Sequence, residues 1–253
     1  MVQLFTKNCI QENLSSLDDW KQKAYLEFEN RMTNTVDKFP CIPATQGFAL
    51  NHLRYGFIED PRKESSSTTL AKLLKHYGEI SRDTGNYASL IVMFDTPPDI
   101  VERYDIEQFE YLFWSLLKTV NEQDEKDWPN HIPTDPDTNT WEFCFDGEQY
   151  FVYCATPKHN NKKSRYFPFF MLAITPRWVL EEFNSHVQVS DRIKKAIRER
   201  LHQYDKTEVH PDLKWYGSEG NYEWKQYFLR DDNTSPSACP FHKQWSINKK
   251  EKQ

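Results

Sequence analysis

The feature that most constrains this chain is an Asp-Gly pair, Asp146-Gly147, between two aromatic, alternating runs at residues 141–145 and 150–154. Asp and Gly tolerate the left-handed backbone that a two-residue hairpin turn requires. The pair therefore predicts a β-hairpin closed by a type I′ turn. In that register, Cys144 lies opposite Gln149.

Two other short apolar segments, residues 89–94 and 169–174, are also predicted strands, because the first ends at an Asp-Thr-Pro-Pro turn and the second is followed by Pro176. A polar stretch at residues 59–68 is predicted to be a loop or a mobile insert. The segments with helical spacing of apolar residues are 16–32, 69–77, 106–120, 176–180 and 190–204.

Helix ends are also visible in the sequence. Asp105 and Gln108 have the spacing of a capping box before the clearest apolar stripe, and Ser16 with Asp19 resembles a second box. Strands in the middle of the chain with helices around them predict an α+β fold. We expect a central, mostly antiparallel sheet with a hairpin, flanked by about five helices and an irregular aromatic C-terminal region.

Composition excludes several classes of protein. The net charge of −6 disfavours a nucleic-acid binder, which usually needs a basic surface. The chain has only 7 glycines and contains neither GxGxxG nor GxxxxGK[ST], which argues against the common nucleotide-binding domains. The longest apolar stretch, residues 167–174, is too short to span a bilayer.

The 5 cysteines indicate the redox environment. Their number is odd, and the first residues lack the basic and apolar regions of a secretory signal. We therefore expect free thiols and a cytoplasmic location. Cys144 and Cys154 fall on opposite faces of the predicted hairpin, so a disulfide between them is not expected.

Two of these cysteines adjoin prolines in short aromatic motifs, Phe39-Pro40-Cys41 and Cys239-Pro240-Phe241. Proline restricts the backbone, so each sulfur is held in a defined direction. A directed thiolate suits a soft metal, a haem iron or a nucleophilic role. The alternative for each is a small buried side chain, since free cysteine is among the most buried residue types.

Five motifs in register resemble the YqcI/YcgG family over roughly residues 15–242. They are Phe39-Pro40-Cys41, Ile197-Arg198-Glu199-Arg200, Pro211-x-Leu213 with Gly217, Glu223-x-Lys225-Gln226-Tyr227, and Cys239-Pro240-Phe241. The chain departs from the family pattern at Thr156, where many members have His, and at Lys225, where Arg is common. The resemblance implies one family domain over residues 1–245, and we expect residues 246–253 to form a disordered tail.

Some members of that family are haem proteins that hydroxylate nitrogen on arginine or related guanidine compounds. The resemblance therefore implies a haem-dependent N-oxygenase acting on a small guanidino or amino compound. The chain has no CxxCH, so any haem b would be held without covalent attachment. The implied partners are a small-molecule substrate and an electron donor of unknown identity, with no nucleic acid and no membrane. The sequence does not indicate an oligomeric state.

Cys41 is the first candidate for the axial ligand of the haem iron, because a thiolate favours O–O cleavage. Arg54, nearby in sequence, is the candidate anchor for a propionate or a substrate carboxylate. Cys239 is the second thiolate candidate, with a packing role as its alternative. His159 is the best histidine candidate, followed by three others. These are His52, His210 and His242.

A guanidinium substrate needs a buried carboxylate, because a planar cation is held by paired hydrogen bonds. Glu223 is the candidate, and Glu142 on the hairpin is the alternative. The alternative for Glu223 is an ordinary salt bridge with Lys225 or with the arginines at 198 and 200. Gln226 and Tyr227 are candidates for the pocket wall, with a plain core role as the alternative.

Other readings of the same residues remain open. A non-catalytic protein of the same fold that binds haem or another small ligand is the main alternative, because of Thr156. A Cys/His hydrolase with Cys41 as nucleophile ranks lower, since no nucleophile signature is present. A closed zinc site is disfavoured, because Cys239 and His242 supply only half of one.

Overall fold

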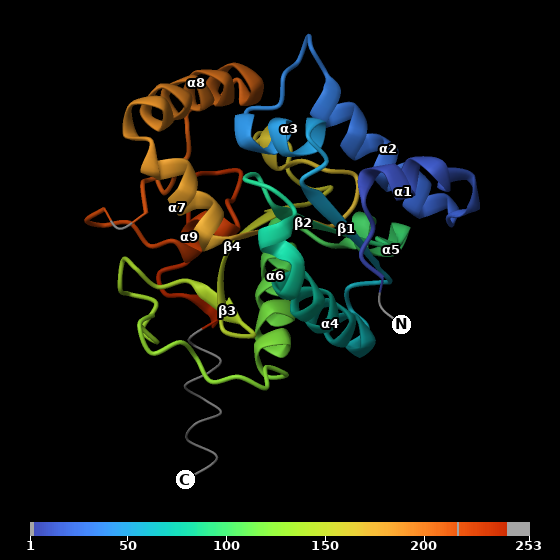
Figure 1. The fold of residues 1–253 in the computed structure, drawn as a ribbon, viewed down its shortest axis with the longest axis horizontal. Helices are drawn as coiled ribbons and strands as arrows, with labels where there is room; N and C mark the ends of the chain where they lie inside the picture. The colour runs from blue at the N-terminus through green and yellow to red at the C-terminus, as the bar shows by residue number, and fades with distance from the viewer. Residues whose placement is uncertain (1–2, 217, 242–253) are drawn as a thin grey trace.

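A computed structural model describes residues 3–216 and 218–241. The fold is built on a five-stranded sheet (Figure 1). The strand order is β1-β2-β5-β4-β3. The β1–β2 pair is parallel and the other three pairs are antiparallel, which confirms the mostly antiparallel sheet. The strands are β1 (Leu53–Ile58), β2 (Ser89–Phe94), β3 (Phe143–Phe145), β4 (Glu148–Ala155) and β5 (Met171–Pro176).

The predicted hairpin is confirmed in type and register. Asp146 and Gly147 have φ values of 53° and 79°, the left-handed backbone of a type I′ turn. Cys144 pairs with Gln149. The hairpin joins β3 to β4 at one edge of the sheet, and it places Glu142 immediately before β3.

The helices are more numerous than predicted. Within the described residues they are α1 (Lys7–Glu12), α2 (Asp19–Thr33), α3 (Ile42–Ala49), α4 (Glu64–Ile80), α5 (Pro98–Arg103), α6 (Ile106–Asn121), α7 (Arg177–Ser185), α8 (Val187–Asp205) and α9 (Trp224–Tyr227). The capping box of α6 is confirmed: Asp105 accepts from the backbone N–H of Gln108, and Gln108 accepts from that of Asp105, both at 2.8 Å. The predicted box at Ser16 is wrong, because α2 follows Asp18 and the Ser16 hydroxyl instead donates to the carbonyl of Asn13.

Helix α4 also corrects the prediction of a loop over residues 59–68. It begins at Glu64 instead of Thr69, so its first turn lies in the polar stretch. The hydroxyl of Ser67 donates to the carbonyl of Glu64 at 2.8 Å, and that of Ser66 donates to the carbonyl of Asp60 at 2.7 Å. Serine favours loops by bonding to nearby backbone, and here the same bonds form within and before a helix.

Strand β1 is absent from the sequence prediction. Its interior contains Gly56, and glycine weakens a strand signal. The structure gives Gly56 a packing role: a Cβ there would lie 2.6 Å from Cδ1 of Leu73 in α4. The missing side chain therefore lets α4 approach the sheet, and β1 adds the one parallel pair.

The two faces of the sheet have separate hydrophobic clusters. Leu90, Val92, Leu172 and Ile174 point to the face covered by α4 and α6, which lie side by side (Figure 1). Their neighbours in sequence, such as Ile91, point to the other face, where α2 and α3 pack. We call the first the closed face and the second the cavity face.

The predictions about the membrane and about the C-terminal tail concern segments that the structure tests only in part. Among the described residues, no helix is both long and apolar enough to cross a lipid bilayer. The predicted tail at residues 246–253 lies outside the described residues.

Candidate functional site

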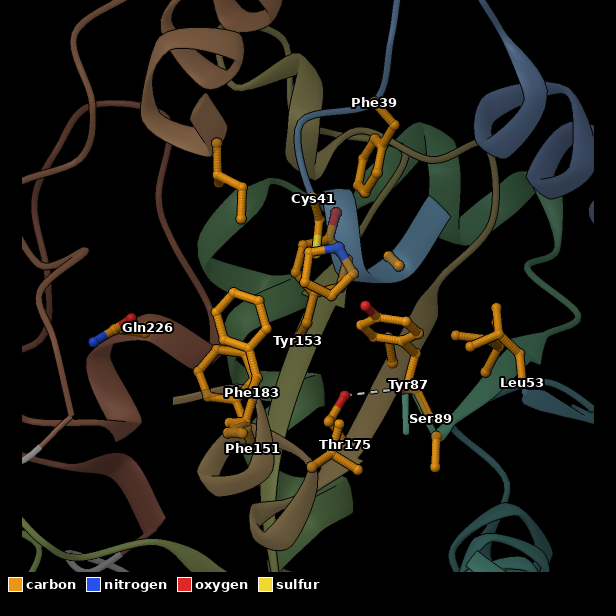
Figure 2. Close-up of a pocket in the computed structure, with 18 of the residues that line it drawn as sticks. Phe39, Cys41, Leu53, Tyr87, Ser89, Phe151, Tyr153, Thr175, Phe183 and Gln226 are labelled. Atoms are coloured by element: carbon orange, nitrogen blue, oxygen red, sulfur yellow. Dashed lines mark hydrogen bonds between the residues drawn. The ribbon is translucent and has the colours of Figure 1, made fainter. Parts of the chain in front are cut away.

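A cavity of about 590 Å³ lies on the cavity face of the sheet. Its floor is made by residues of four strands, including Leu53 of β1, Ser89 of β2, Tyr153 of β4, and Thr175 of β5, which is joined there by Ala173. The hydroxyls of Ser89 and Thr175 lie 3.0 Å apart and supply a polar pair in this floor (Figure 2). Alternation along the strands explains the arrangement, because these side chains share one face of the sheet.

The roof of the cavity comes from segments far apart in sequence. Helix α2 contributes Arg31, α7 contributes Phe183, α8 contributes Lys194, and the loop before α9 contributes Lys214 and residues 215–216. The walls are mainly apolar and aromatic, with a few charged groups among them. This composition is typical of a small-molecule or cofactor site, and the volume lies in the usual range of about 300 to 1,000 Å³.

Cys41 lines this cavity from the residue just before α3. Its backbone is extended, with φ −72° and ψ 98°, and Pro43 follows in the first turn of the helix. Figure 2 shows Phe39 and Cys41 at one end of the pocket, Ser89 and Thr175 at the other, and Tyr153 between them. Burial raises the pKa of the Cys41 thiol, and the backbone N–H of Ala44 partly opposes this rise.

A cluster of buried charges borders another part of the cavity. Arg177, the first residue of α7, contacts Glu142 Oε1 with its Nη2 atom and donates from the same atom to Glu223 Oε1 at 2.9 Å. The exposed fractions are 0% for Glu142 and 3% each for Arg177 and Glu223. Arg177 and Glu223 line the cavity directly. Two carboxylates thus share one guanidinium away from water.

Burial dominates the electrostatics of the cluster. It raises the pKa of Glu142 to about 7, although Arg177 acts in the opposite direction. The ring of Tyr216 covers the guanidinium of Arg177 at 3.7 Å from its centroid. Because Arg177 is paired on two sides and covered on a third, its position is strongly determined.

Glu223 is held by further hydrogen bonds. Asn221 Nδ2 donates to Glu223 Oε2 at 3.2 Å, and Gln226 Nε2 donates to Asn221 Oδ1 at 2.8 Å. Gln226 also donates to the carbonyl of Lys214 at 3.1 Å and lines the cavity. This network fixes the direction of the Glu223 carboxylate before any ligand binds.

Comparison with known proteins identifies the family. The family model described as the YqcI/YcgG family matches residues 28–242, most of the chain. The chain belongs to this family. The range includes Cys41, Glu142, Arg177 and Glu223.

Members of the YqcI/YcgG family with similar sequences include two Bacillus subtilis proteins described as uncharacterised. YcgG is 48% identical, covering 94% of this chain and 94% of YcgG, and YqcI is 45% identical, covering 100% of this chain and 99% of YqcI. A more distant relative, 29% identical over 89% of this chain and 85% of its own length, is DcsA of Streptomyces lavendulae, which carries the assigned name N(omega)-hydroxy-L-arginine synthase. No solved structure matches this chain.

The structure brings two of the predicted site residues, Cys41 and Glu223, to the same cavity of this family member. It does not place Arg54 there. Leu53 lines the cavity, and the next side chain along β1 points to the opposite face, where Arg54 donates to the carbonyls of Asn51 and Leu53 at 3.1 and 2.9 Å. Arg54 is thus separated from Cys41 by the sheet.

His159 also lies away from the cavity lining that the structure describes. Its ring is 1% exposed, and its Nε2 donates to the carbonyl of Leu229 at 2.8 Å. That bond places the proton on Nε2, so Nδ1 accepts from the hydroxyl of Thr156 at 2.9 Å. Burial lowers the pKa of His159 to about 4. Thr156, the departure from the family pattern, therefore orients His159.

The remaining candidates have other surroundings. Cys239 is buried in the cluster of the closed face, the packing role considered for it from the sequence. His52 stacks on Tyr87, and buried His210 accepts from the backbone N–H of Asp212 at 3.2 Å. His242 lies outside the described residues.

The remaining residues of the C-terminal motifs divide between the cavity and the core. Tyr227 is core: its hydroxyl accepts from the backbone N–H of Phe143 and donates to the carbonyl of Tyr150. Arg198 donates to the carbonyl of Leu213 at 3.1 Å and lies over Trp215. Neither Lys225 nor Arg198 forms the ion pair with Glu223 that was considered from the sequence, because Arg177 takes that position.

Arg177 is the one candidate site residue in this charged cluster that the sequence did not reveal. A signal was present, because Arg177 follows a predicted strand and Pro176 at the start of a predicted helix, where charged residues often serve binding sites. The partners of Arg177 lie at residues 142 and 223, so its role depends on contacts that no local pattern reveals.

Proposed function

We propose that this chain is a haem-dependent N-oxygenase that hydroxylates a nitrogen of a small guanidino or amino compound. The observation that carries the proposal is that a directed thiol, Cys41, and a buried carboxylate, Glu223, border the same cavity. The name of the relative DcsA supports an activity of this class, a hydroxylation of a guanidino nitrogen. Family membership alone supports the fold more firmly than the chemistry.

The residues of the cavity fit a haem group. A haem iron needs one axial protein ligand, and the Cys41 sulfur lies at the cavity wall. The walls are largely aromatic and aliphatic, as a porphyrin face requires. Three cationic side chains line the same space: Arg31, Lys194 and Lys214. They suit the propionates and take the anchoring role that was expected of Arg54. When bound, haem would supply the activation of O₂.

Cys41 would act as a thiolate, although burial favours its protonated form in the free protein. For Cys41 to hold the iron, its thiol proton would therefore have to be released to solvent. The position before α3 assists this ionisation, because the backbone N–H of Ala44 opposes the effect of burial and a helix N-terminus favours negative charge. The affinity of Cys41 for a metal should accordingly increase with pH.

Glu223 would hold the cationic end of the substrate. Its carboxylate is already oriented by Arg177 and Asn221, so little ordering is needed on binding. The overall reaction takes one O₂, two electrons from a donor and two protons, places one oxygen atom on the substrate nitrogen, and releases the other as water. The apolar walls exclude water from the rest of the site.

Titration of the purified full chain with hemin tests the proposal. We expect a Soret band, and with carbon monoxide on the reduced protein we expect the red-shifted band that a thiolate ligand produces. Cys41→Ala should lose the thiolate signature, and Cys9→Ala, a partly buried cysteine of α1 away from the cavity, should keep it. Far-UV circular dichroism of both variants checks that the fold is retained.

Other outcomes of this titration reassign the ligand or reject the proposal. Persistence of the thiolate signature in Cys41→Ala would transfer the role to Cys239, and an imidazole-type spectrum lost in His159→Ala would transfer it to His159. A protein that takes up no hemin contradicts the oxygenase. If haem binds but the reduced protein leaves arginine and simpler guanidines unchanged in O₂, the non-catalytic binding protein is the better description.

A further inference from the structure

The cluster of Glu142, Arg177 and Glu223 has an unbalanced charge. Arg177 contacts both carboxylates, and no other lysine or arginine among the described residues lies within ion-pair distance of either. With both carboxylates ionised, the cluster has one excess negative charge in a place almost without water. Such a charge is strongly unfavourable unless it is neutralised.

A second cluster in the same molecule shows why burial matters. Arg230 also contacts two carboxylates, Glu107 at 2.9 Å and Glu110 at 2.6 Å. The side chain of Glu107 is 67% exposed, so water stabilises its charge. The cluster at Arg177 has no such exposed member, and the cavity is the open side from which a neutralising charge can come.

We propose that the Glu142–Arg177–Glu223 cluster is a receptor for a single positive charge, in which a planar cation from the cavity pairs with Glu223 while Glu142 releases a proton to solvent. Glu142 is then a specificity-determining residue that selects a cation over a neutral molecule of the same shape. The inference rests on the proposed function for its substrate class, because it concerns the same cavity.

The exchange needs a group on Glu142 that can lose a proton near neutral pH. Burial raises the pKa of Glu142 to about 7, which supports the exchange. The charged and titratable groups that face it are Arg177, Glu223, Tyr216, Tyr227 and Cys144. Burial raises the pKa of both tyrosines and of Cys144 further above the neutral range, so these three groups do not exchange the proton there.

The linkage has a definite sign. A cation beside Glu223 favours the ionised form of Glu142, so binding releases a proton and the affinity increases with pH below about 7. Above that value Glu142 is already ionised in the free protein, and the affinity becomes independent of pH. Between pH 6 and pH 8 this amounts to roughly a tenfold increase in affinity.

Isothermal titration calorimetry with L-arginine and L-citrulline measures the exchange. The two probes have nearly the same shape, but only arginine has a cationic side chain. We expect arginine to bind roughly ten times more tightly at pH 8 than at pH 6. Repeating the titration at pH 6 in two buffers of different ionisation enthalpy should show close to one proton released per arginine. Citrulline should bind more weakly and release no proton.

The variants Glu142→Gln and Glu110→Gln form a matched pair. Both replace a buried glutamate that contacts an arginine, but Glu110 lies in α6 at the Arg230 cluster, on the other side of the sheet. Glu142→Gln should bind arginine with the low affinity of the wild type at pH 6 and lose the pH dependence. Glu110→Gln should retain both the affinity and the dependence. The proton count on the wild-type protein needs neither variant to fold.

Several results would overturn the inference. They are equal affinity for arginine at both pH values, no proton release, equally tight binding of citrulline, or no binding of arginine at pH 8 with or without hemin. The arginine titration can succeed or fail independently of the hemin titration that tests the proposed function. Proton-coupled arginine binding by a protein that takes up no hemin supports the receptor and contradicts the oxygenase. Hemin uptake and product formation without pH-dependent binding of arginine would support the oxygenase and contradict the receptor.

Discussion

The closed face and the cavity face of the sheet are built from alternate residues of the same strands, yet the first is covered by a large hydrophobic cluster and the second contains a cavity of about 590 Å³. On β5, Leu172 and Ile174 fill the closed face, whereas Ala173 and Thr175 face the cavity. On β2, Leu90 similarly contrasts with Ser89. Ser89, Ala173 and Thr175 are small and leave space under the helices that cover the cavity face, whereas larger side chains such as Met171 line the rest of the floor. A binding site can thus be encoded in the size alternation of otherwise ordinary strands.

The faces also differ in how they treat buried polar groups. Buried His159 contacts the ring of Phe228 in the closed-face cluster and has both ring nitrogens paired with neutral partners. On the cavity side, Glu142 and Glu223 share one cation. The first arrangement is complete by itself, and we propose that the second is completed by a ligand. The following experiments test this difference.

The largest expected effect follows from removing the shared cation. Arg177→Met should lower the free energy of unfolding by about 3–5 kcal/mol at pH 8, because two buried carboxylates then have no cation to neutralise them. The loss should be smaller at pH 6, where Glu142 is protonated more readily. Urea unfolding at both pH values measures it. Arg230→Met is the control and should lose less, since Glu107 is exposed; an equal loss would contradict the comparison.

Next in size is a pair of opposite pH effects. The pKa of His159 is lowered from 6.5 to about 4, so its contribution to stability decreases as pH falls below 6.5. The pKa of Glu142 is raised from 4.5 to about 7, so its contribution decreases as pH rises above 4.5. Each contribution is up to about 3 kcal/mol, and the two oppose each other between pH 4.5 and pH 6.5.

Single variants should expose each contribution. Relative to the wild type, His159→Gln should become less stable with rising pH in this window, and Glu142→Gln should become more stable. Urea unfolding at pH 4.5, 5.5 and 6.5 gives the slopes. If the two variants change the slope in the same direction, the assigned difference between the faces is wrong.

A third, smaller effect concerns the unfilled volume of the cavity, which two Ala-to-Leu variants compare with the packed closed face. Ala71→Leu in α4 adds volume to the packed closed face and should cost about 1–3 kcal/mol in unfolding free energy. Ala173→Leu adds the same volume to the cavity floor and should cost less than about 1 kcal/mol. The second variant should nevertheless weaken hemin uptake strongly, and the first should leave it unchanged. Equal costs would indicate that both faces are filled alike.

The smallest expected effect concerns a helix end on the closed face. Asp105→Ala removes the capping bond to the backbone N–H of Gln108 and should cost about 1 kcal/mol in thermal or urea unfolding. Binding of hemin and arginine should not change, because α6 does not line the cavity. A change in either affinity would show that the two faces are coupled.

The sequence by itself determined the features that depend on a few neighbouring residues. The Asp146-Gly147 turn and the Asp105 capping box were predicted correctly, since each is a set of bonds within a short segment. The buried strand at residues 89–94 was equally clear from its apolar run. The prediction that Cys41 and Glu223 belong to a site came from the family motifs, and the structure places both at one cavity.

Tertiary structure alone decided which of these residues meet. Glu142, Arg177 and Glu223 come together because the residue before β3, the end of β5 and the loop before α9 meet in space. Arg54, close to Cys41 in sequence, points to the opposite face because strand side chains alternate. Ion pairs between distant segments depend on the path of the whole chain, and no local propensity or spacing contains that information.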